Sequence, residues 1–139
     1  MEKTDSLRLD SKQVSALPVI NKFIDRIELK KLLSSYIFSK KNQKLSYVDA
    51  ILIFVRNILL EREPLYKLSE WAAGFDPCLV GLNNADPEIL NDDRVGRSLD
   101  ALFDADRASL LTSLVLKVID EFSIEMSQMH NDSTTVTGY

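Results

Sequence analysis

Apolar residues recur at helical spacing along most of the chain. The first such stretch follows the i, i+3, i+4, i+7 pattern, with apolar residues at Ile20, Phe23, Ile24 and Ile27. The same pattern repeats between Leu29 and Ile37. These two stretches predict two short amphipathic helices.

A third stretch, from Tyr47 to Leu60, is apolar on nearly every side. Its polar residues are Asp49, Arg56 and Asn57, and Ser46 stands where a helix needs an N-cap. The rest of the protein must cover a helix of this kind. We therefore expect residues 47–60 to form the centre of the hydrophobic core.

A further helix is predicted shortly after Leu60. Pro64 suits its first turn, Tyr66 and Trp71 are expected in or at the edge of the core, and Gly74 is a natural stop. Residues 75–86 then have the Pro, Gly and Asn content of a connecting stretch.

Two more helices are predicted before the composition changes. Asn91 or Asp92 caps the first of them, and Asp104 or Asp106 caps the second. The second carries one apolar stripe, made of Leu110, Leu111, Leu114, Val115, Val118, Ile119 and Phe122.

The expected fold is mainly α, with a compact domain of six or seven helices over residues 17–122 after an N-terminal tail of residues 1–16. Beyond Ser123, apolar and polar residues alternate in a Thr-rich segment, which is typical of a strand. A lone strand is not stable in water. We therefore expect residues 123–139 to be the first strand of a second domain that is truncated here.

Composition narrows the class of protein. The chain has 139 residues, of which 45% are hydrophobic and 27% charged, as in a folded domain rather than a disordered one. Its one cysteine, Cys78, cannot form an internal disulfide or a thiolate metal site. It also has no nearby His or second Cys, so we do not expect it to be a nucleophile. The N-terminus lacks the apolar segment of a signal peptide, and the longest apolar run is too short to span a bilayer. We expect a soluble cytoplasmic protein with no membrane partner and no small-molecule substrate.

Charge is distributed unevenly around a formal net charge of −4. Residues 61–139 are strongly acidic, whereas residues 22–44 hold two acids, Asp25 and Glu28, against seven bases: Lys22, Arg26, Lys30, Lys31, Lys40, Lys41 and Lys44. These bases are candidates for contacts with DNA phosphates. The alternative is a solvated, lysine-rich pair of helices. The loop from Ser39 to Leu45 is longer than the turn of a helix-turn-helix motif, so the spacing does not predict that motif.

Several spaced segments carry a family resemblance. The segment Asn91–Asp100 (NDDRVGRSLD), followed by His130–Thr135 (HNDSTT) and Gly138-Tyr139, resembles the N-terminal region of bacterial insertion-sequence transposases of the DDE type. Arg62–Tyr66 (REPLY) and Glu70–Ala72 (EWA) are similar to the stretch that precedes the Asn-Asp motif in those proteins. The segments occur in the same order, and the resemblance extends from about Leu17 to Tyr139.

The resemblance implies that an RNase H-like catalytic domain follows the helical region and that Asp132 is the first of three acidic metal ligands. Three carboxylates hold two Mg²⁺ ions, which activate the attacking oxygen and stabilise the leaving oxygen in phosphodiester cleavage and strand transfer. His130 shares a strand face with Asp132 and is a candidate for supporting the metal site or contacting phosphate, or else a plain polar residue. Ser133 stands where the family usually has Thr. Without the resemblance, Asp132 would be an ordinary surface aspartate.

Other polar residues near the motif have simpler explanations. Asn91, Asp92 and Asp93 precede an apolar helical pattern and are expected to cap a helix rather than bind metal. Arg94 and Arg97 lie one turn apart and either contact DNA or pair with nearby aspartates.

The expected function is that of the N-terminal portion of a DDE transposase, through binding of element ends, their positioning, or subunit assembly. Its partners would be DNA and a second copy of the chain, and Mg²⁺ would be a cofactor of a full-length relative rather than of this chain. Two alternatives stay open. One is a helical protein-interaction module with no DNA role, consistent with the acidic charge, and the other is a non-functional remnant of a transposase.

We expect the purified chain to have no nuclease or strand-transfer activity with Mg²⁺ or Mn²⁺, because one candidate carboxylate does not hold two metal ions. The measurement is incubation with supercoiled plasmid and metal. Nicking that survives repurification and disappears in the Asp132→Ala variant would contradict this expectation.

Overall fold

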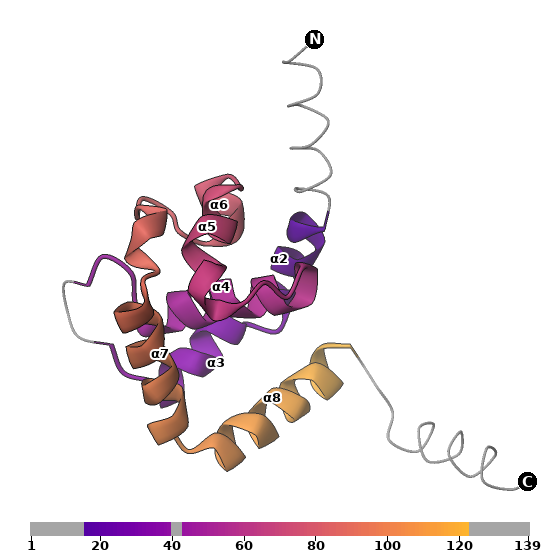
Figure 1. Ribbon diagram of the computed structural model, residues 1–139. Coiled ribbons are helices and arrows are strands. Elements are labelled where there is room, and N and C mark those ends of the chain that lie inside the picture. The colour runs from indigo at the N-terminus through magenta and orange to yellow at the C-terminus, as the bar shows by residue number, and fades with distance from the viewer. Residues whose placement is uncertain (1–15, 40–42, 123–139) are drawn as a thin grey trace, which may run out of the picture.

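The computed structural model describes residues 16–39 and 43–122 and shows a mainly helical fold (Figure 1). Within these residues there are seven α-helices and two short 3₁₀ turns, and no strand. The helices are α2 (Leu17–Arg26), α3 (Leu29–Tyr36), α4 (Tyr47–Leu60), α5 (Leu68–Ala73), α6 (Pro77–Val80), α7 (Asp92–Asp104) and α8 (Arg107–Glu121), and the 3₁₀ turns are η1 (Leu65–Lys67) and η2 (Pro87–Ile89).

This fold confirms the predicted mainly helical class. The expected strand over residues 123–139 lies outside the described residues, as does the expected N-terminal tail except for Ala16. No helix in the described part of the chain combines the length and the hydrophobicity needed to cross a membrane.

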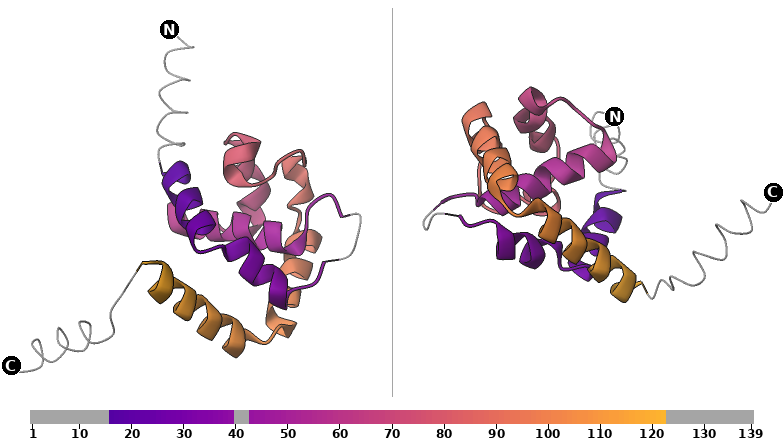
Figure 2. Two further views of the ribbon diagram at one scale, coloured as in Figure 1. Left: turned by 180° about the vertical axis from the view of Figure 1, so that it is seen from behind. Right: turned by 90° about the horizontal axis from the view of Figure 1, so that it is seen from below.

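Helix α4 lies at the centre of the molecule and packs against α2, α3, α5 and α7 (Figures 1 and 2). It begins at Ser46, whose side chain accepts a hydrogen bond of 3.0 Å from the Asp49 backbone N–H, so the predicted N-cap is confirmed. Five apolar residues of its first two turns are buried: Val48, Ala50, Ile51, Leu52 and Ile53. The last turn is different, because Ile58 and Leu59 are exposed.

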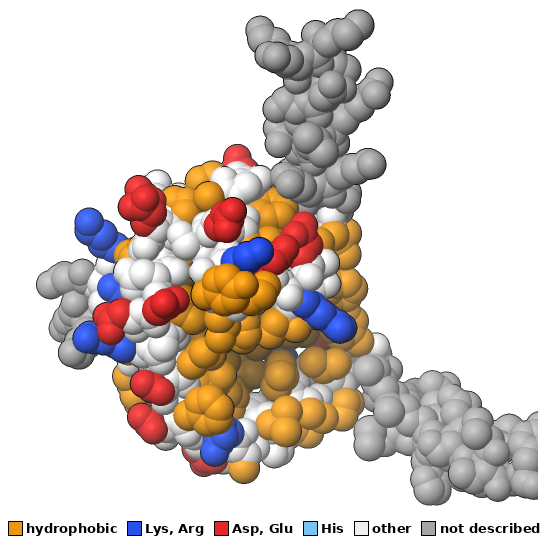
Figure 3. All heavy atoms as spheres, in the orientation of Figure 1, with side chains coloured by type: hydrophobic (Ala, Val, Ile, Leu, Met, Phe, Trp, Pro, Cys, Tyr) orange, Lys and Arg blue, Asp and Glu red, His pale blue; other side chains and the backbone are white. Residues whose placement is uncertain are grey.

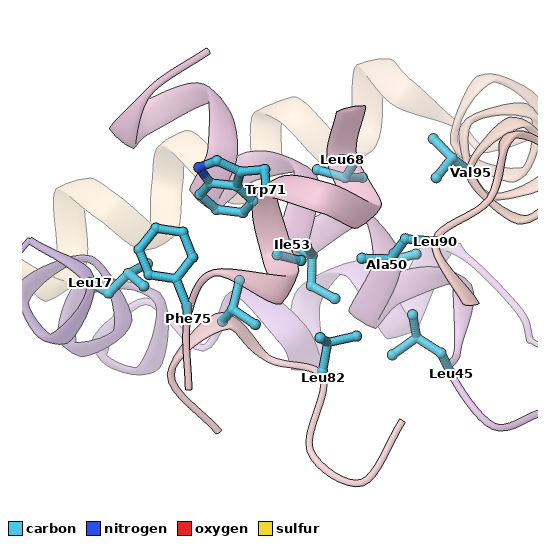
Figure 4. Close-up of a cluster of buried hydrophobic side chains, with 12 residues drawn as sticks. Leu17, Leu45, Ala50, Ile53, Leu68, Trp71, Phe75, Leu82, Leu90 and Val95 are labelled. Carbon is cyan, nitrogen blue, oxygen red and sulfur yellow. The ribbon is translucent and has the colours of Figure 1, made fainter. Parts of the chain in front are cut away.

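Two clusters of buried side chains meet at α4. One cluster joins Ala50 and Ile53 to residues of α5, α6 and α7, among them Leu68 and Val95, and Figure 4 shows Ile53 pointing into its middle. The other cluster joins Val48, Ile51 and Leu52 to residues of α2, α3 and α8. Because α4 supplies side chains to both clusters, it connects the two halves of the fold.

Asn57 is a fully buried polar residue in this apolar helix. Its side-chain amide donates to the Glu63 carbonyl at 2.7 Å, and its side-chain oxygen accepts from the Glu63 N–H at 3.0 Å. The intervening Arg62 has a left-handed backbone with φ of 60°. Asn57 thus satisfies the backbone of the turn that ends α4 and reverses the chain towards η1.

Arg56 joins α2, α4 and α6 through polar contacts. Its Nε donates to Asn21 Oδ1 at 2.6 Å and its Nη1 donates to the Val80 carbonyl at 3.2 Å, while the Asn21 amide donates to the Leu79 carbonyl at 2.8 Å. Burial lowers the pKa of the Arg56 guanidinium. Gly81 has φ of 97°, and a Cβ added there would collide with the guanidinium, so both the backbone conformation and the packing require glycine.

Two sequence-based expectations need correction. The stretch 75–86 is not only a connection, because α6 forms in it, capped by the Asp76 side chain and ended by Gly81 in the left-handed conformation. Tyr66 is not in the core, since 73% of it is exposed, whereas Trp71 is buried as expected.

We expect Ile53→Asp to abolish cooperative folding, because Ile53 has no exposed surface and an unpaired carboxylate there cannot be solvated. Ile53→Ala should lower the free energy of unfolding by about 2–5 kcal/mol. The measurement is thermal and urea unfolding followed by circular dichroism. The matched control is Leu59→Asp on the exposed end of the same helix, and equal effects of the two aspartates would contradict the central position of Ile53.

Candidate nucleic-acid interface

The structure describes five of the seven predicted DNA-binding residues. Lys22 and Arg26 lie on α2, Lys30 and Lys31 lie on α3, and Lys44 lies in the loop before α4. The other two, Lys40 and Lys41, lie outside the described residues.

Three of these five bases form ion pairs with acidic residues. Arg26 Nε lies 3.6 Å from Glu121 of α8, and Lys30 Nζ lies 3.1 Å from Asp49 of α4. Lys31 Nζ lies 3.7 Å from Glu28, which is the N-cap residue of α3. The local excess of positive charge in the sequence is therefore partly neutralised by acids that the fold brings beside it.

The remaining two bases differ in their surroundings. Lys22 and Lys44 are exposed, and neither forms an ion pair within 4.0 Å among residues 16–39 and 43–122. Lys44 nevertheless lines a surface hollow together with Asp49, Asp86 and Glu88. Of the five described candidates, Lys22 is thus the one most available to an anionic ligand.

Glu28 connects two bases from distant parts of the chain. Its carboxylate accepts a hydrogen bond of 2.9 Å from Lys117 of α8 and lies near Lys31. The hydrogen bond and charge of Lys117, followed by the charge of Lys31, lower the pKa of Glu28, and the same hydrogen bond raises the pKa of Lys117. Glu28 has a left-handed backbone with φ of 51° at the junction of α2 and α3. Sequence reasoning missed Lys117 because it lies 89 residues away from Glu28.

The arginines of the Asn-Asp segment have structural roles. Asn91 Oδ1 accepts from the Arg94 backbone N–H at 2.9 Å, so Asn91 is the N-cap of α7. The Arg94 guanidinium donates to the Leu45 carbonyl at 3.2 Å, and Arg97 Nε lies 3.2 Å from Asp93. Capping of α7 and local pairing of Arg97 with an aspartate are therefore confirmed. In the described part of the chain, no group of three acidic, His or Cys side chains is placed to hold a metal ion.

The model of one protein family matches residues 9–116 of the chain. That family is described as a domain of unknown function, DUF4277. The chain belongs to it. No curated protein and no solved structure gave a match.

The DUF4277 match begins before α2 and ends within α8, so it includes all seven predicted DNA-binding bases. Lys117 lies just beyond it. Asp132 and His130, the predicted catalytic and metal-site residues, lie beyond the match and outside the described residues.

We expect the contact between Glu28 and Lys117 to stabilise the fold between about pH 4.3 and about pH 10.4, the ordinary pKa values of the two side chains. Glu28 has a lowered pKa in the folded state, so its contribution is lost as the pH falls through that pKa. The raised pKa of Lys117 means that its contribution is lost only as the pH rises through that value.

The measurement compares the unfolding midpoints of wild type and Glu28→Gln from about pH 7 to about pH 3. The difference between the two proteins should shrink in acid. Glu61→Gln, at an exposed glutamate, is the control and should leave the midpoint nearly unchanged. A difference for Glu28→Gln that stays constant down to pH 3 would mean that the carboxylate charge is not what stabilises the contact.

Proposed function

We propose that this chain is the N-terminal helical part of a DDE-type transposase and acts in DNA transposition by binding element ends, by positioning them, or by subunit assembly. The observation that carries the proposal is the ordered series of segments that resemble that family: Arg62–Tyr66, Glu70–Ala72, Asn91–Asp100 and His130–Tyr139. Agreement of several spaced segments supports a common origin more strongly than one short motif does.

The positions of three of these segments support the proposal further. The segment Arg62–Tyr66 leads into η1, which packs against α7, and Asn91–Asp100 caps and begins α7. Trp71, from the Glu70–Ala72 segment, and Val95 of α7 belong to the same buried cluster. The resembling segments thus form part of one packed unit rather than separate surface loops.

Under this proposal Asp132 would be the first acidic ligand of a catalytic Mg²⁺ site, with His130 beside it. Mg²⁺ would supply Lewis-acid activation of the reacting oxygens in the complete catalytic domain. The part played by the described residues is to bind and orient DNA or another subunit.

The DNA-contacting surface in the proposal is the basic segment of α2, α3 and the following loop. Lys30 and Lys31 form ion pairs, but their side chains are 60% and 83% exposed. Such surface pairs contribute about 0–1 kcal/mol, so a phosphate could replace the carboxylate partner at little cost. Lys22 and Lys44 require no such exchange, since neither is ion-paired in the described part of the chain.

A protein-interaction module without a DNA role is the second candidate. Two observations favour it: acids pair with three of the five described candidate bases, and large apolar side chains of α8 are exposed. Exposed apolar surface of this kind is typical of protein-binding faces.

Binding to duplex DNA separates the two candidates. We expect the chain to bind duplexes with little sequence preference, because lysine contacts phosphates rather than base edges. The variant with Lys22, Lys40, Lys41 and Lys44 all changed to Gln should lose most of this affinity. If all four contact phosphates, the slope of log K against log salt should become shallower by about 3–4, since each phosphate contact contributes about 0.9.

The matched control removes four positive charges elsewhere, with Arg62, Lys67, Arg97 and Arg107 changed to Gln. Fluorescence anisotropy over a salt series gives the affinities, and circular dichroism shows whether both variants stay folded. Equal loss in both variants would indicate dependence on net charge only. No salt-dependent binding by the wild type would favour the protein-interaction module.

A further inference from the structure

A hollow with an acidic rim lies between the end of α4 and helix α5. Four charged side chains line it: Glu61, Glu63, Lys67 and Glu70. None of the four forms an ion pair within 4.0 Å among the described residues. In Figure 3 acidic side chains stand out over the upper part of the molecule, where α5 and the end of α4 lie, whereas apolar side chains dominate the surface beside α8. We call this hollow the acidic hollow.

The end of α4 fixes one side of the acidic hollow. Glu61 is the C-cap residue of α4. The buried Asn57 side chain then holds the Glu63 backbone through hydrogen bonds of 2.7 Å and 3.0 Å. A helix carries partial negative charge at its C-terminus, so the end of α4 adds to the negative charge of the glutamates. This side of the hollow therefore favours a cation.

Trp71 and Phe75 form the apolar wall of the acidic hollow. They are 7% and 8% exposed, and their ring centroids lie 4.9 Å apart. The Trp71 indole N–H is buried and has no acceptor among the described residues. Figure 4 shows this nitrogen at the end of the ring that points away from Ile53 and Leu68. Because Trp71 also lines the hollow, its N–H lies on the side of the ring that faces the hollow.

A buried N–H without an acceptor is destabilising, so a ligand that supplies a carbonyl oxygen to Trp71 relieves that cost. The acceptor must displace a side chain at the rim, because the indole nitrogen is closed off from solvent. Glu61, Lys67 and Glu70 at the rim are exposed and hold no ion pair in the described part of the chain. The hollow thus offers carboxylates to a cation and an N–H donor to a carbonyl.

Spacing and size narrow the class of ligand. Within the described residues no three acidic, His or Cys side chains are placed to hold one metal ion, so the three glutamates do not form a metal site. The hollow has a volume of about 230 Å³. Pockets for drug-sized ligands measure about 300–1,000 Å³, and one water takes about 30 Å³. The acidic hollow therefore has room for one long side chain rather than for a cofactor.

We propose that the acidic hollow binds an arginine side chain of a partner protein. The guanidinium pairs with the carboxylates of Glu63 and Glu70, and the peptide carbonyl beside the arginine accepts from the Trp71 N–H. Arginine suits this site better than lysine, because its planar group has five donors for separate carboxylates and packs against aromatic rings. The inference goes beyond the proposed function, since it concerns a protein ligand and does not depend on DNA binding.

Trp71 provides the measurement, because the chain has one tryptophan and hence one indole N–H signal in a nitrogen–proton NMR spectrum. The probe is the peptide acetyl-Gly-Gly-Arg-Gly-Gly-amide, added to the full 139-residue chain at low salt without DNA. We expect the indole proton to move downfield with half-saturation at or below about 1 mM. A peptide with citrulline in place of arginine keeps the shape without the charge and should bind at least about 10-fold more weakly.

Charge variants test the assignment to the acidic hollow. Glu63→Gln combined with Glu70→Gln should weaken binding of the arginine peptide by at least about 10-fold. Lys67→Gln should strengthen it by about two- to fivefold, because it removes a like charge from the rim. The matched control is Asp100→Asn combined with Asp104→Asn, which removes two exposed negative charges that do not line the hollow. This control should bind like the wild type, and circular dichroism should show the same helicity for all variants.

Three results would overturn the proposal. One is the absence of a saturable shift of the Trp71 signal up to about 10 mM arginine peptide. Another is equal affinity for the citrulline peptide, which would show that the hollow does not recognise charge. The third is equal weakening in the Asp100 and Asp104 control, which would mean that net charge rather than the hollow attracts the peptide. A lysine peptide that binds as tightly as the arginine peptide would overturn the choice of arginine.

Discussion

The need to remove α4 from water on almost every side governs the arrangement of the other helices. Buried residues of its first two turns point into two different clusters. Helices α5, α6 and α7 cover one side, α3 and α8 cover the other, and α2 contributes to both. Helix α4 supplies five buried apolar residues, more than any other described helix, and each well-buried aliphatic side chain contributes about 1.5–3 kcal/mol. Because α2 and α3 cover α4, their basic residues lie beside α8 and beside Asp49 in the first turn of α4.

Features determined by neighbouring residues could be predicted from the sequence. The periodicity of α2, α3, α4 and α8 and the side-chain caps at Ser46, Asn91 and Asp106 each depend on a few consecutive positions, and all are present. Helix α6 was missed because a four-residue helix has no periodicity to detect and depends instead on the Asp76 cap and on Gly81. The exposure of Tyr66 was missed because only tertiary packing decides which aromatic side chain is covered.

The candidate site was predicted less completely than the fold, for an electrostatic reason. The net charge of residues 22–44 takes account of the acids within that stretch. It omits Asp49 and Glu121, which the fold places beside Lys30 and Arg26. Lys117, which joins Lys31 at Glu28, was equally out of reach of a local count. In the same way, the apolar stripe of α8 was visible in the sequence, while the exposure of Leu111 and Val115 was not.

The bond that attaches α2 to α6 has a consequence for synthesis on the ribosome. The acceptor for the Asn21 amide is the Leu79 carbonyl, 58 residues later in the chain. At about 5–20 residues per second, that carbonyl is made about 3–12 seconds after Asn21. A ten-residue helix is only marginally stable alone. During those seconds α2 lacks this attachment, so it reaches its final position only after α6 has been made.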